Sequence, residues 1–390
     1  MSARQSKVLI SAGMIQGGLS GVGRYVVEIA QRIPQSSGVD LHVAGLVDDR
    51  HLFPKTSDAN WISIPKRYAK GAANLFWHTM ALPRILRQRS FDLYHSPSYR
   101  RIIPCCPAAQ IATVHDCAPF HLREKYGLIR GFFGRSFAPA MARRCQGILT
   151  VSHFTARDIV QFYKIPIDSI NVIHNGLDHN TYYPRDSKAL ADFRQRMGIA
   201  KPYLLYISRL EHPGKNHVRL IEAYDRARKA GIIDAPLVLG GAPWHGAETI
   251  RQRVASSPFA ASILLPGFIE EADLPLWYGA AAALIFPSLI EGFGLPVAEA
   301  LACGIPVLSS DRGSLPEVGG DAALYFDPTD IDSIVRSLEE FANCKPEARE
   351  ALCKRGIKQA AKFHWDNAAQ ATAKAYLKLL GPFATHQESK

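Results

Sequence analysis

Two glutamates, eight residues apart, frame the stretch of the chain that is best suited to chemistry. Glu291 falls in a glycine-containing loop. Glu299 falls about one turn into a helix that Pro296 is suited to begin, because a proline loses nothing at the first helical position. The two carboxylates would therefore lie at opposite ends of an extended ligand. Because carboxylates accept hydrogen bonds from vicinal hydroxyls, a ribose at one end and a sugar ring at the other are the natural partners. The alternative is a capping glutamate beside a surface glutamate.

The start of the same helix offers a phosphate site. Its first turn would leave backbone N–H groups open around Gly294, Leu295 and Val297, at the positive end of the helix dipole. Amides in this arrangement bind phosphate. Gly292 and Gly294 would let such a ligand approach the main chain, since glycine has no side chain. We therefore expect a phosphate group at this helix start.

Two cations follow a predicted strand at residues 203–208. Arg209 comes directly after the strand, and Lys215 comes six residues later, beyond a Pro-Gly turn. Such a pair can clamp a diphosphate from two sides. Both cations would lie outside the carboxyl end of a strand, where open parallel sheets bind their ligands. The alternative is a pair of solvated loop cations.

The elements that must position these residues alternate along the 390-residue chain. Short apolar runs separated by helical patterns predict parallel strands that are covered on both faces, and hence an α/β protein with two doubly wound sheets. The predicted strands are residues 7–11, 41–46, 61–64, 93–95, 111–115, 147–151, 171–174, 203–208, 237–240, 263–265, 283–286, 306–309 and 323–326.

The domain boundary is predicted between residues 178 and 202, ahead of a fresh strand. We place an N-terminal domain at 1–182 and a C-terminal domain at 183–365. Residues 348–380 have a helical pattern, and the helix within 366–390 could cross back to the N-terminal domain. The chain from Gly381 onward is expected to be frayed.

Taken together, these motifs resemble the glycosyltransferases of family 4, which have the GT-B fold of two Rossmann-like domains facing each other across a cleft. The resemblance covers nearly the whole chain. It rests on the segments 206–216, 287–307 and 314–318 in the second half, and on 17–25, 114–116, 151–155 and 173–178 in the first half. The glutamate pair in its Gly-Phe-Gly-Leu-Pro frame is the specific part.

The resemblance implies a retaining transfer from a nucleotide-diphosphate sugar that is held by the C-terminal domain. Arg209 and Lys215 would hold the diphosphate and neutralise the charge that develops on the leaving group. Glu299 would bind the ribose, and Glu291 would hold the donor sugar with backbone amides of the glycine loop. The implied donor residues are Arg209, Lys215, Ile269, Glu291, Gly292, Phe293, Gly294, Leu295 and Glu299, with Ile269 in the loop that contacts the base.

In the N-terminal domain, the resemblance implies that His115 approaches the donor sugar and completes a catalytic set with Arg209, Lys215 and Glu291. The alternative for His115 is a packed core histidine. Since neighbours on a strand point to opposite faces, His115 and Asp116 can both reach one substrate only where the strand ends. The residues expected on the cleft and acceptor side are Gly17, Gly18, Gly21, Asp116, Ser152 and Asn175.

Neither a metal nor a cofactor is expected. Cations and a helix start would replace the metal, and the formal D-x-D at Asp330 and Asp332 opens a helical pattern, where acidic residues belong. The glycines at 18, 21 and 23 are not in the order of the dinucleotide fingerprint, so nicotinamide chemistry is disfavoured.

The net charge of +11 is confined to one half of the chain. Residues 1–190 hold 24 Lys and Arg against 12 Asp and Glu, whereas the remainder is nearly balanced. Residues 66–101 and 123–144 combine basic with aromatic side chains, which is typical of proteins that dock on an anionic membrane surface. An ordinary solvated surface is the alternative. Nucleic acid is disfavoured, because no helix-turn-helix or RNP pattern is present.

The chain start and the cysteines bear on location. Only a short apolar stretch follows the N-terminus, and the seven cysteines form no C-x-x-C pair, which favours a reducing compartment. No segment is long and apolar enough to span a bilayer. We therefore expect a cytoplasmic protein, peripheral at the inner face of the plasma membrane.

The reading that unites these features is a hexosyltransferase of cell-surface polysaccharide synthesis, acting on a glycan or lipid-linked acceptor. Residues 309–323 look most like bacterial mannosyltransferases of polysaccharide or lipopolysaccharide assembly, which favours GDP-mannose as donor over a UDP-sugar. A soluble GT-B transferase or a nucleotide-sugar epimerase would share the donor site without a membrane acceptor. A basic nucleic-acid-binding protein is the remaining alternative.

Overall fold

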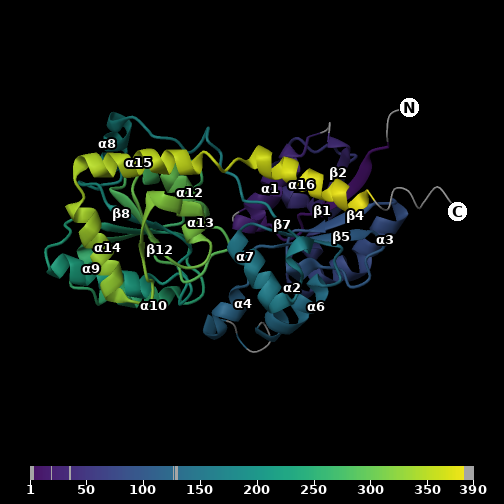
Figure 1. Ribbon diagram of the computed structural model, residues 1–390, viewed down its shortest axis with the longest axis horizontal. Helices are drawn as coiled ribbons and strands as arrows, with labels where there is room; N and C mark the ends of the chain where they lie inside the picture. Colours follow the sequence, from purple (N-terminus) through teal and green to yellow (C-terminus); the bar gives the residue numbers. More distant parts are fainter. Residues whose placement is uncertain (1–3, 19, 35–36, 126, 128–130, 382–390) are drawn as a thin grey trace. The chain divides into compact units, whose positions relative to one another are not determined.

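The computed structural model of the protein describes residues 4–18, 20–34, 37–125, 127 and 131–381 (Figure 1). The expected fraying after Gly381 concerns residues 382–390, which lie outside this description. The chain divides into two compact units. The first unit comprises the described residues up to Phe120, those from 127 to Gly176, and those from His364 onward. The second unit comprises His121–Lys125 and Leu177–Phe363.

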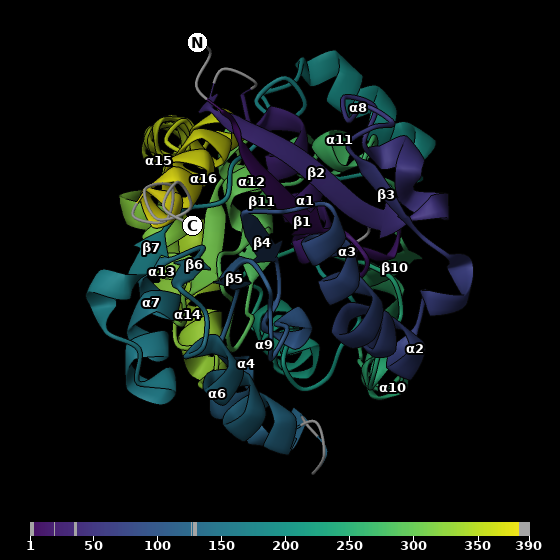
Figure 2. The same cartoon turned by 90° about the vertical axis from the view of Figure 1, so that its right-hand side faces the viewer.

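The first unit contains a seven-stranded parallel sheet in the order β3-β2-β1-β4-β5-β6-β7. Figure 2 shows β2 and β3 toward one edge of this sheet and β7 at the other. Its strands are β1 Ser6–Ser11, β2 Val39–Leu46, β3 Trp61–Ile64, β4 Leu93–Ser96, β5 Ala109–Val114, β6 Gly147–Thr150 and β7 Ile170–Val172. Every residue of β4 and β6 is buried, as expected for strands that are covered on both faces.

The second unit contains a six-stranded parallel sheet in the order β10-β9-β8-β11-β12-β13. Its strands are β8 Leu204–Ile207, β9 Leu237–Gly240, β10 Ile263–Gly267, β11 Ala283–Phe286, β12 Val307–Ser310 and β13 Ala323–Phe326. All thirteen predicted strands are therefore confirmed, with ends that differ by at most two residues. The two sheets are those of the predicted GT-B fold.

Helices flank both sheets. Up to Ser187 they are α1 Gly21–Arg32, α2 Gly71–Phe76, α3 Leu82–Gln88, α4 Ala118–His121, α6 Ala138–Ala142 and α7 His153–Asp158. From Ser187 onward they are α8 Ser187–Arg196, α9 His217–Lys229, α10 Ala247–Ala255, α11 Leu274–Gly279, α12 Leu295–Ala302, α13 Leu315–Gly319, α14 Ile331–Asn343, α15 Pro346–Ala360 and α16 Trp365–Leu380. Within the described residues, none of the helices is both long and apolar enough to cross a membrane.

The helical pattern predicted for residues 348–380 is interrupted in the structure. One helix, α15, ends at Ala360, and the next, α16, begins at Trp365. The break between the two helices falls where the chain leaves the second unit at Phe363 and enters the first at His364. His364 has an extended backbone at the start of α16.

The last helix, α16, packs along α1 in the first unit (Figure 1). Asp366 near its start pairs with Arg32 of α1 at 3.3 Å. Tyr376 near its end lies 2.7 Å from Nδ1 of His95, at the end of β4. The first residue of α16 also lies close to Gly176, which follows β7: a Cβ added to Gly176 would fall 2.0 Å from the backbone nitrogen of Trp365. Glycine at 176 therefore makes room for the helix.

Candidate active site

An ion pair joins two loops of the second unit. The cation loop, between β8 and α9, contains Lys215, and the glycine loop, between β11 and α12, contains Glu291. The Nζ atom of Lys215 is 2.5 Å from Oε1 of Glu291, and the two side chains are 19% and 16% exposed. The two loops belong to neighbouring strands of the sheet, so the pair lies at the carboxyl edge where such sheets bind ligands. The structure thus brings together two residues that were predicted to share a site.

The start of α12 is built as a bare helix end. Gly294 precedes the helix with φ of +100°, and proline is in the first turn. Within the described residues, no side chain caps this helix start. Its backbone amides are therefore oriented as in anion-binding helix starts. Glycine is required at 294, because an added Cβ would also fall 2.5 Å from Cδ2 of Leu315.

A serine of the next loop braces the glycine loop. The hydroxyl of Ser314 lies 3.0 Å from the carbonyl oxygen of Glu291 and 2.8 Å from that of Phe293. The Ser314 amide also donates to the Glu291 carbonyl at 3.3 Å. Gly313 lets this loop approach, because a Cβ there would fall 2.9 Å from the same carbonyl oxygen. Gly292 and Leu295, the other predicted members of the glycine loop, are half-buried. Ser314 belongs to the motif at 314–318, but its sequence context did not indicate this contact.

The second predicted cation, Arg209, has two neighbours that the sequence did not indicate. Its guanidinium carbon lies 4.8 Å from the centre of the Trp244 ring, which is itself half exposed. Its Nη2 atom lies 3.5 Å from Oε2 of the buried Glu211. Burial alone would raise the pKa of Glu211, but the hydrogen bond and charge of Lys125, together with Lys215 and Arg209, bring that pKa below its usual range. Glu211 is therefore charged at neutral pH.

The side chain of Glu299, the second glutamate of the pair, is held in place by a tyrosine. Glu299 is buried, and its Oε2 atom accepts a hydrogen bond of 2.7 Å from the hydroxyl of Tyr278 on α11. Burial, together with the nearby Glu299 carboxylate, raises the pKa of Tyr278 well above its ordinary value. Tyr278 therefore stays protonated and acts as the donor. Sequence reasoning missed this tyrosine, because nothing in its surrounding pattern marks it.

The predicted base loop follows β10. Gly267 ends the strand with φ of +81°, and its carbonyl oxygen accepts from the amide of Gly241 at 2.7 Å. The side chain of Ile269 is buried, and a Cβ added to Gly240 would fall 2.5 Å from it. Phe268 is about half exposed. The side chain of Ile269 is therefore packed away, and a ligand at this loop would meet its backbone.

In the first unit, His115 comes directly after β5. Its Nε2 atom is 3.0 Å from the carbonyl oxygen of Pro97, and the edge of its ring meets Tyr25 at a centroid distance of 4.9 Å. Burial lowers the pKa of His115, and the nearby Asp116 offsets this only in part. The neutral ring therefore donates from Nε2 and keeps Nδ1 as an acceptor. Asp116 accepts from the Ala118 amide at 3.0 Å, so its carboxylate serves the start of α4.

The remaining candidates of the first unit also follow the carboxyl ends of strands. Gly17 and Gly18, after β1, have φ of +72° and +80°, and Gly21 is the first residue of α1. Ser152, after β6, accepts from the Thr155 amide at 3.1 Å and so caps α7. Asn175, after β7, is buried, and among the described residues its Oδ1 has no hydrogen-bond partner. These positions share one edge of the parallel sheet.

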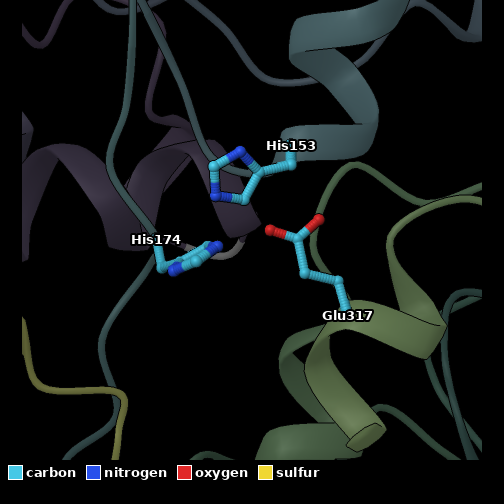
Figure 3. A group of neighbouring side chains, drawn as sticks. All are labelled: His153, His174 and Glu317. Atoms are coloured by element: carbon cyan, nitrogen blue, oxygen red, sulfur yellow. The ribbon is translucent and has the colours of Figure 1, made fainter.

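Among the residues that the structure describes, few could hold a metal. The rings of His153 and His174 meet edge to face at a centroid distance of 5.7 Å (Figure 3). Two imidazoles supply only two of the four ligands of a structural zinc site, and Glu317, drawn with them, belongs to the second unit. Asp330 caps α14 through the Asp332 amide, and Asp332 pairs with Arg226. The D-x-D is thus a helix start, in line with its sequence pattern.

Two doubly wound units, one of which carries paired cations and a bare helix start beyond its strands, define a GT-B glycosyltransferase. Comparison with known families agrees with this class. The family described as Glycosyltransferase Family 4 matches residues 19–181, and the family described as Glycosyl transferases group 1 matches residues 191–359. The chain therefore belongs to family 4 of the glycosyltransferases.

Individual relatives support the same family. The chain is 30% identical over 391 residues to the O-antigen chain mannosyltransferase B of Escherichia coli, with 95% of this chain and 99% of the relative covered. It is 28% identical over 306 residues to the serotype-specific mannosyltransferase WbdA of Escherichia coli, with 76% of this chain and 37% of that longer relative covered. The Anabaena protein HepE, solved with UDP and glucose, shares the fold with a TM-score of 0.77 at 16% identity, with 96% of this chain and 100% of HepE covered.

Proposed function

We propose that the protein is a retaining, metal-independent mannosyltransferase that moves a sugar from GDP-mannose to a glycan or lipid-linked acceptor in cell-surface polysaccharide synthesis. The observation that carries the proposal is the contact between Lys215 and Glu291 beside the bare start of α12. This arrangement combines three groups: a cation that can bind phosphate, the uncapped backbone amides at a helix start, and a carboxylate that can bind hydroxyls. A nucleotide-diphosphate sugar needs all three.

The charge of the leaving diphosphate is the main electrostatic demand of this reaction. Arg209 and Lys215 would bind it from the loop after β8, and the amides at the start of α12 would bind it from the next strand. Fixed charges and dipoles of this kind stabilise developing negative charge, because they need no reorganisation during the reaction. A metal ion would be redundant for this task.

The two glutamates would fix the ends of the donor. Glu299, held by Tyr278, would accept hydrogen bonds from the ribose, and the backbone near Ile269 would contact the base. Glu291 would exchange its contact with Lys215 for the sugar hydroxyls when the phosphate takes over the lysine. Sugar, ribose and diphosphate would thus each have a dedicated group in the second unit.

The first unit would bind the acceptor and present His115 to the sugar. Because burial keeps His115 neutral, its Nδ1 atom can accept a hydrogen bond from a sugar hydroxyl. We assign no protein nucleophile. The residues proposed for the acceptor side are Gly17, Gly18, Gly21, Asp116, Ser152 and Asn175.

The choice of GDP-mannose draws on the mannosyltransferase names of the relatives, at 30% identity or below. Calorimetric titration with a panel of nucleotide sugars tests it, followed by a search for slow donor hydrolysis. Binding and hydrolysis of GDP-mannose are expected. Binding of UDP-glucose without binding of GDP-mannose would end the mannose assignment but keep the transferase. If none of the nucleotide sugars binds, the proposed transferase function is wrong.

A membrane-associated acceptor accords with the surface of the two basic segments. Phe76 and Met80 in the first segment, and Phe132 and Phe137 in the second, are exposed apolar side chains among basic residues. Arg130 of the second segment lies outside the described residues. Exposed aromatic and basic side chains together favour an anionic lipid surface. Sedimentation with anionic and with neutral vesicles separates this proposal from a soluble transferase or an epimerase.

A further inference from the structure

A third basic residue of the second unit contacts the cation loop. Lys125, on the short segment His121–Lys125 that is part of this unit, has its Nζ atom 2.5 Å from Oε1 of Glu211. In the sequence, Lys125 stands out only as a member of the basic segment 123–144. The Lys125 side chain is 23% exposed and that of Glu211 is 2% exposed. This ion pair is therefore largely withdrawn from solvent.

The Glu211 carboxylate lies among three cations. Lys125 is in contact with one oxygen, Arg209 is 3.5 Å from the other, and Lys215 adds its positive charge nearby. The turn between them is narrow, because a Cβ added to Gly214 would fall 3.0 Å from Oε1 of Glu211 and 3.4 Å from Nζ of Lys125. A buried carboxylate needs such partners, since an unpaired charge in this setting is strongly unfavourable.

The distances differ in a way that bears on phosphate binding. The Lys125 contact is short, whereas Arg209 is 3.5 Å from Glu211 and its guanidinium is stacked on the exposed ring of Trp244. Of these two cations, Lys125 is thus the nearer partner of Glu211. Arg209 is left loosely bound, with 47% of its side chain exposed. A cation in this state can turn to a phosphate at little loss.

We propose that Lys125 is a positioning residue for the donor diphosphate: by neutralising Glu211, it releases Arg209 and Lys215 to bind phosphate. The inference rests on the proposed function of these two cations. Without Lys125, the full charge of Glu211 would draw Arg209 inward, and an incoming diphosphate would meet an uncompensated carboxylate. Both effects weaken diphosphate binding, and neither requires Lys125 to touch the phosphate.

A set of four variants tests the inference, with GDP and UDP as probes in calorimetric titration. Lys125→Met is expected to weaken binding of whichever nucleotide the wild type binds by at least about tenfold. Lys125→Arg, which keeps the charge, is expected to stay within about threefold of the wild type. The double variant Lys125→Met with Glu211→Gln is expected to recover most of the lost affinity, because the buried charge is removed with its partner. The matched control is Lys201→Met, since Lys201 pairs with Asp234 at an exposed site of the same unit.

The outcomes separate the inference from the proposed function. Wild-type affinity in Lys125→Met would overturn the inference and leave the function intact. A double variant that binds as weakly as Lys125→Met would also overturn it, because Lys125 would then act on the phosphate itself. Failure of the wild type to bind either nucleotide would overturn the proposed function and the inference with it. If Lys125→Met melts well below the wild type, Lys125→Arg and the double variant decide. Affinity close to that of the wild type in both supports the inference, and weak binding by the double variant alone overturns it.

Discussion

Lys215 and Glu291, separated by 76 positions in the chain, are ion-pair partners at 2.5 Å in the second unit. One of them is proposed to bind the leaving phosphate and the other the donor sugar. Their contact therefore keeps both side chains in the site before a ligand arrives. When the donor binds, Lys215 would exchange Glu291 for the phosphate, and Glu291 would exchange Lys215 for the sugar hydroxyls. A site of this kind is preorganised, because the groups need not be gathered when the ligand binds.

Replacing Lys215 tests its role in the reaction. Lys215→Ala is expected to lower kcat by roughly 100-fold and to weaken donor binding by much less, because a charge that acts on the leaving group matters most in the transition state. Steady-state kinetics and titration with the donor give the two quantities. Lys188→Ala, at an exposed position of α8, is the control. Equal losses in both quantities would contradict the role.

Removal of the Glu299 carboxylate is expected to act on binding. Glu299→Ala should weaken the donor by about 1–3 kcal/mol, the range for leaving hydrogen-bonding groups without partners. Calorimetry with the donor and with its 2′-deoxy and 3′-deoxy analogues measures this effect. The loss should be smaller for an analogue that lacks the hydroxyl bound by Glu299. An identical loss for all three ligands would place Glu299 away from the ribose.

Removal of the Tyr278 hydroxyl tests the anchor of Glu299. Tyr278→Phe keeps the buried ring and deletes the donor that lies 2.7 Å from Glu299. The free energy of donor binding is expected to fall by about 0.5–1.5 kcal/mol, because the carboxylate is no longer held in one orientation. The same deoxy analogues check the coupling. If Tyr278→Phe weakens all of them as much as the full donor, Tyr278 supports the fold and not the ribose contact.

Features that depend on neighbouring residues could be predicted from the sequence, whereas contacts between residues far apart in the chain could not. Apolar runs such as that of β11 revealed all thirteen strands, because a strand covered on both faces has a pattern within a few residues. The cation and glycine loops were found in the same way, since their residue types and spacing are local. Tyr278, Glu211 and Lys125 were missed. Each contacts a partner on another element, and the sequence around it carries no sign of that partner.

The structure also makes a prediction on stability and pH. Burial lowers the pKa of His95 from 6.5 to about 3, so the folded protein binds this proton less readily than the unfolded chain does. Stability from His95 is therefore fully present above pH 6.5 and is lost as the pH falls below that value, by about 2 kcal/mol at pH 5. Urea unfolding between pH 7.5 and pH 5 measures the slope. His95→Gln is expected to reduce the slope, and an unchanged slope would contradict the assignment.

The exposed aromatic side chains of the basic segments provide the test of membrane docking. Phe76 and Phe132 are 56% and 67% exposed, and burial of such a ring in lipid contributes about 1.5–3 kcal/mol. The double variant Phe76→Ser and Phe132→Ser should therefore reduce binding to phosphatidylglycerol vesicles by at least about tenfold, while neutral phosphatidylcholine vesicles bind neither protein well. Ile357→Ser, at an exposed position of α15, is the control. If the aromatic variant still sediments with anionic vesicles like the wild type, the rings do not enter the lipid, and charge alone or a different face must account for the binding.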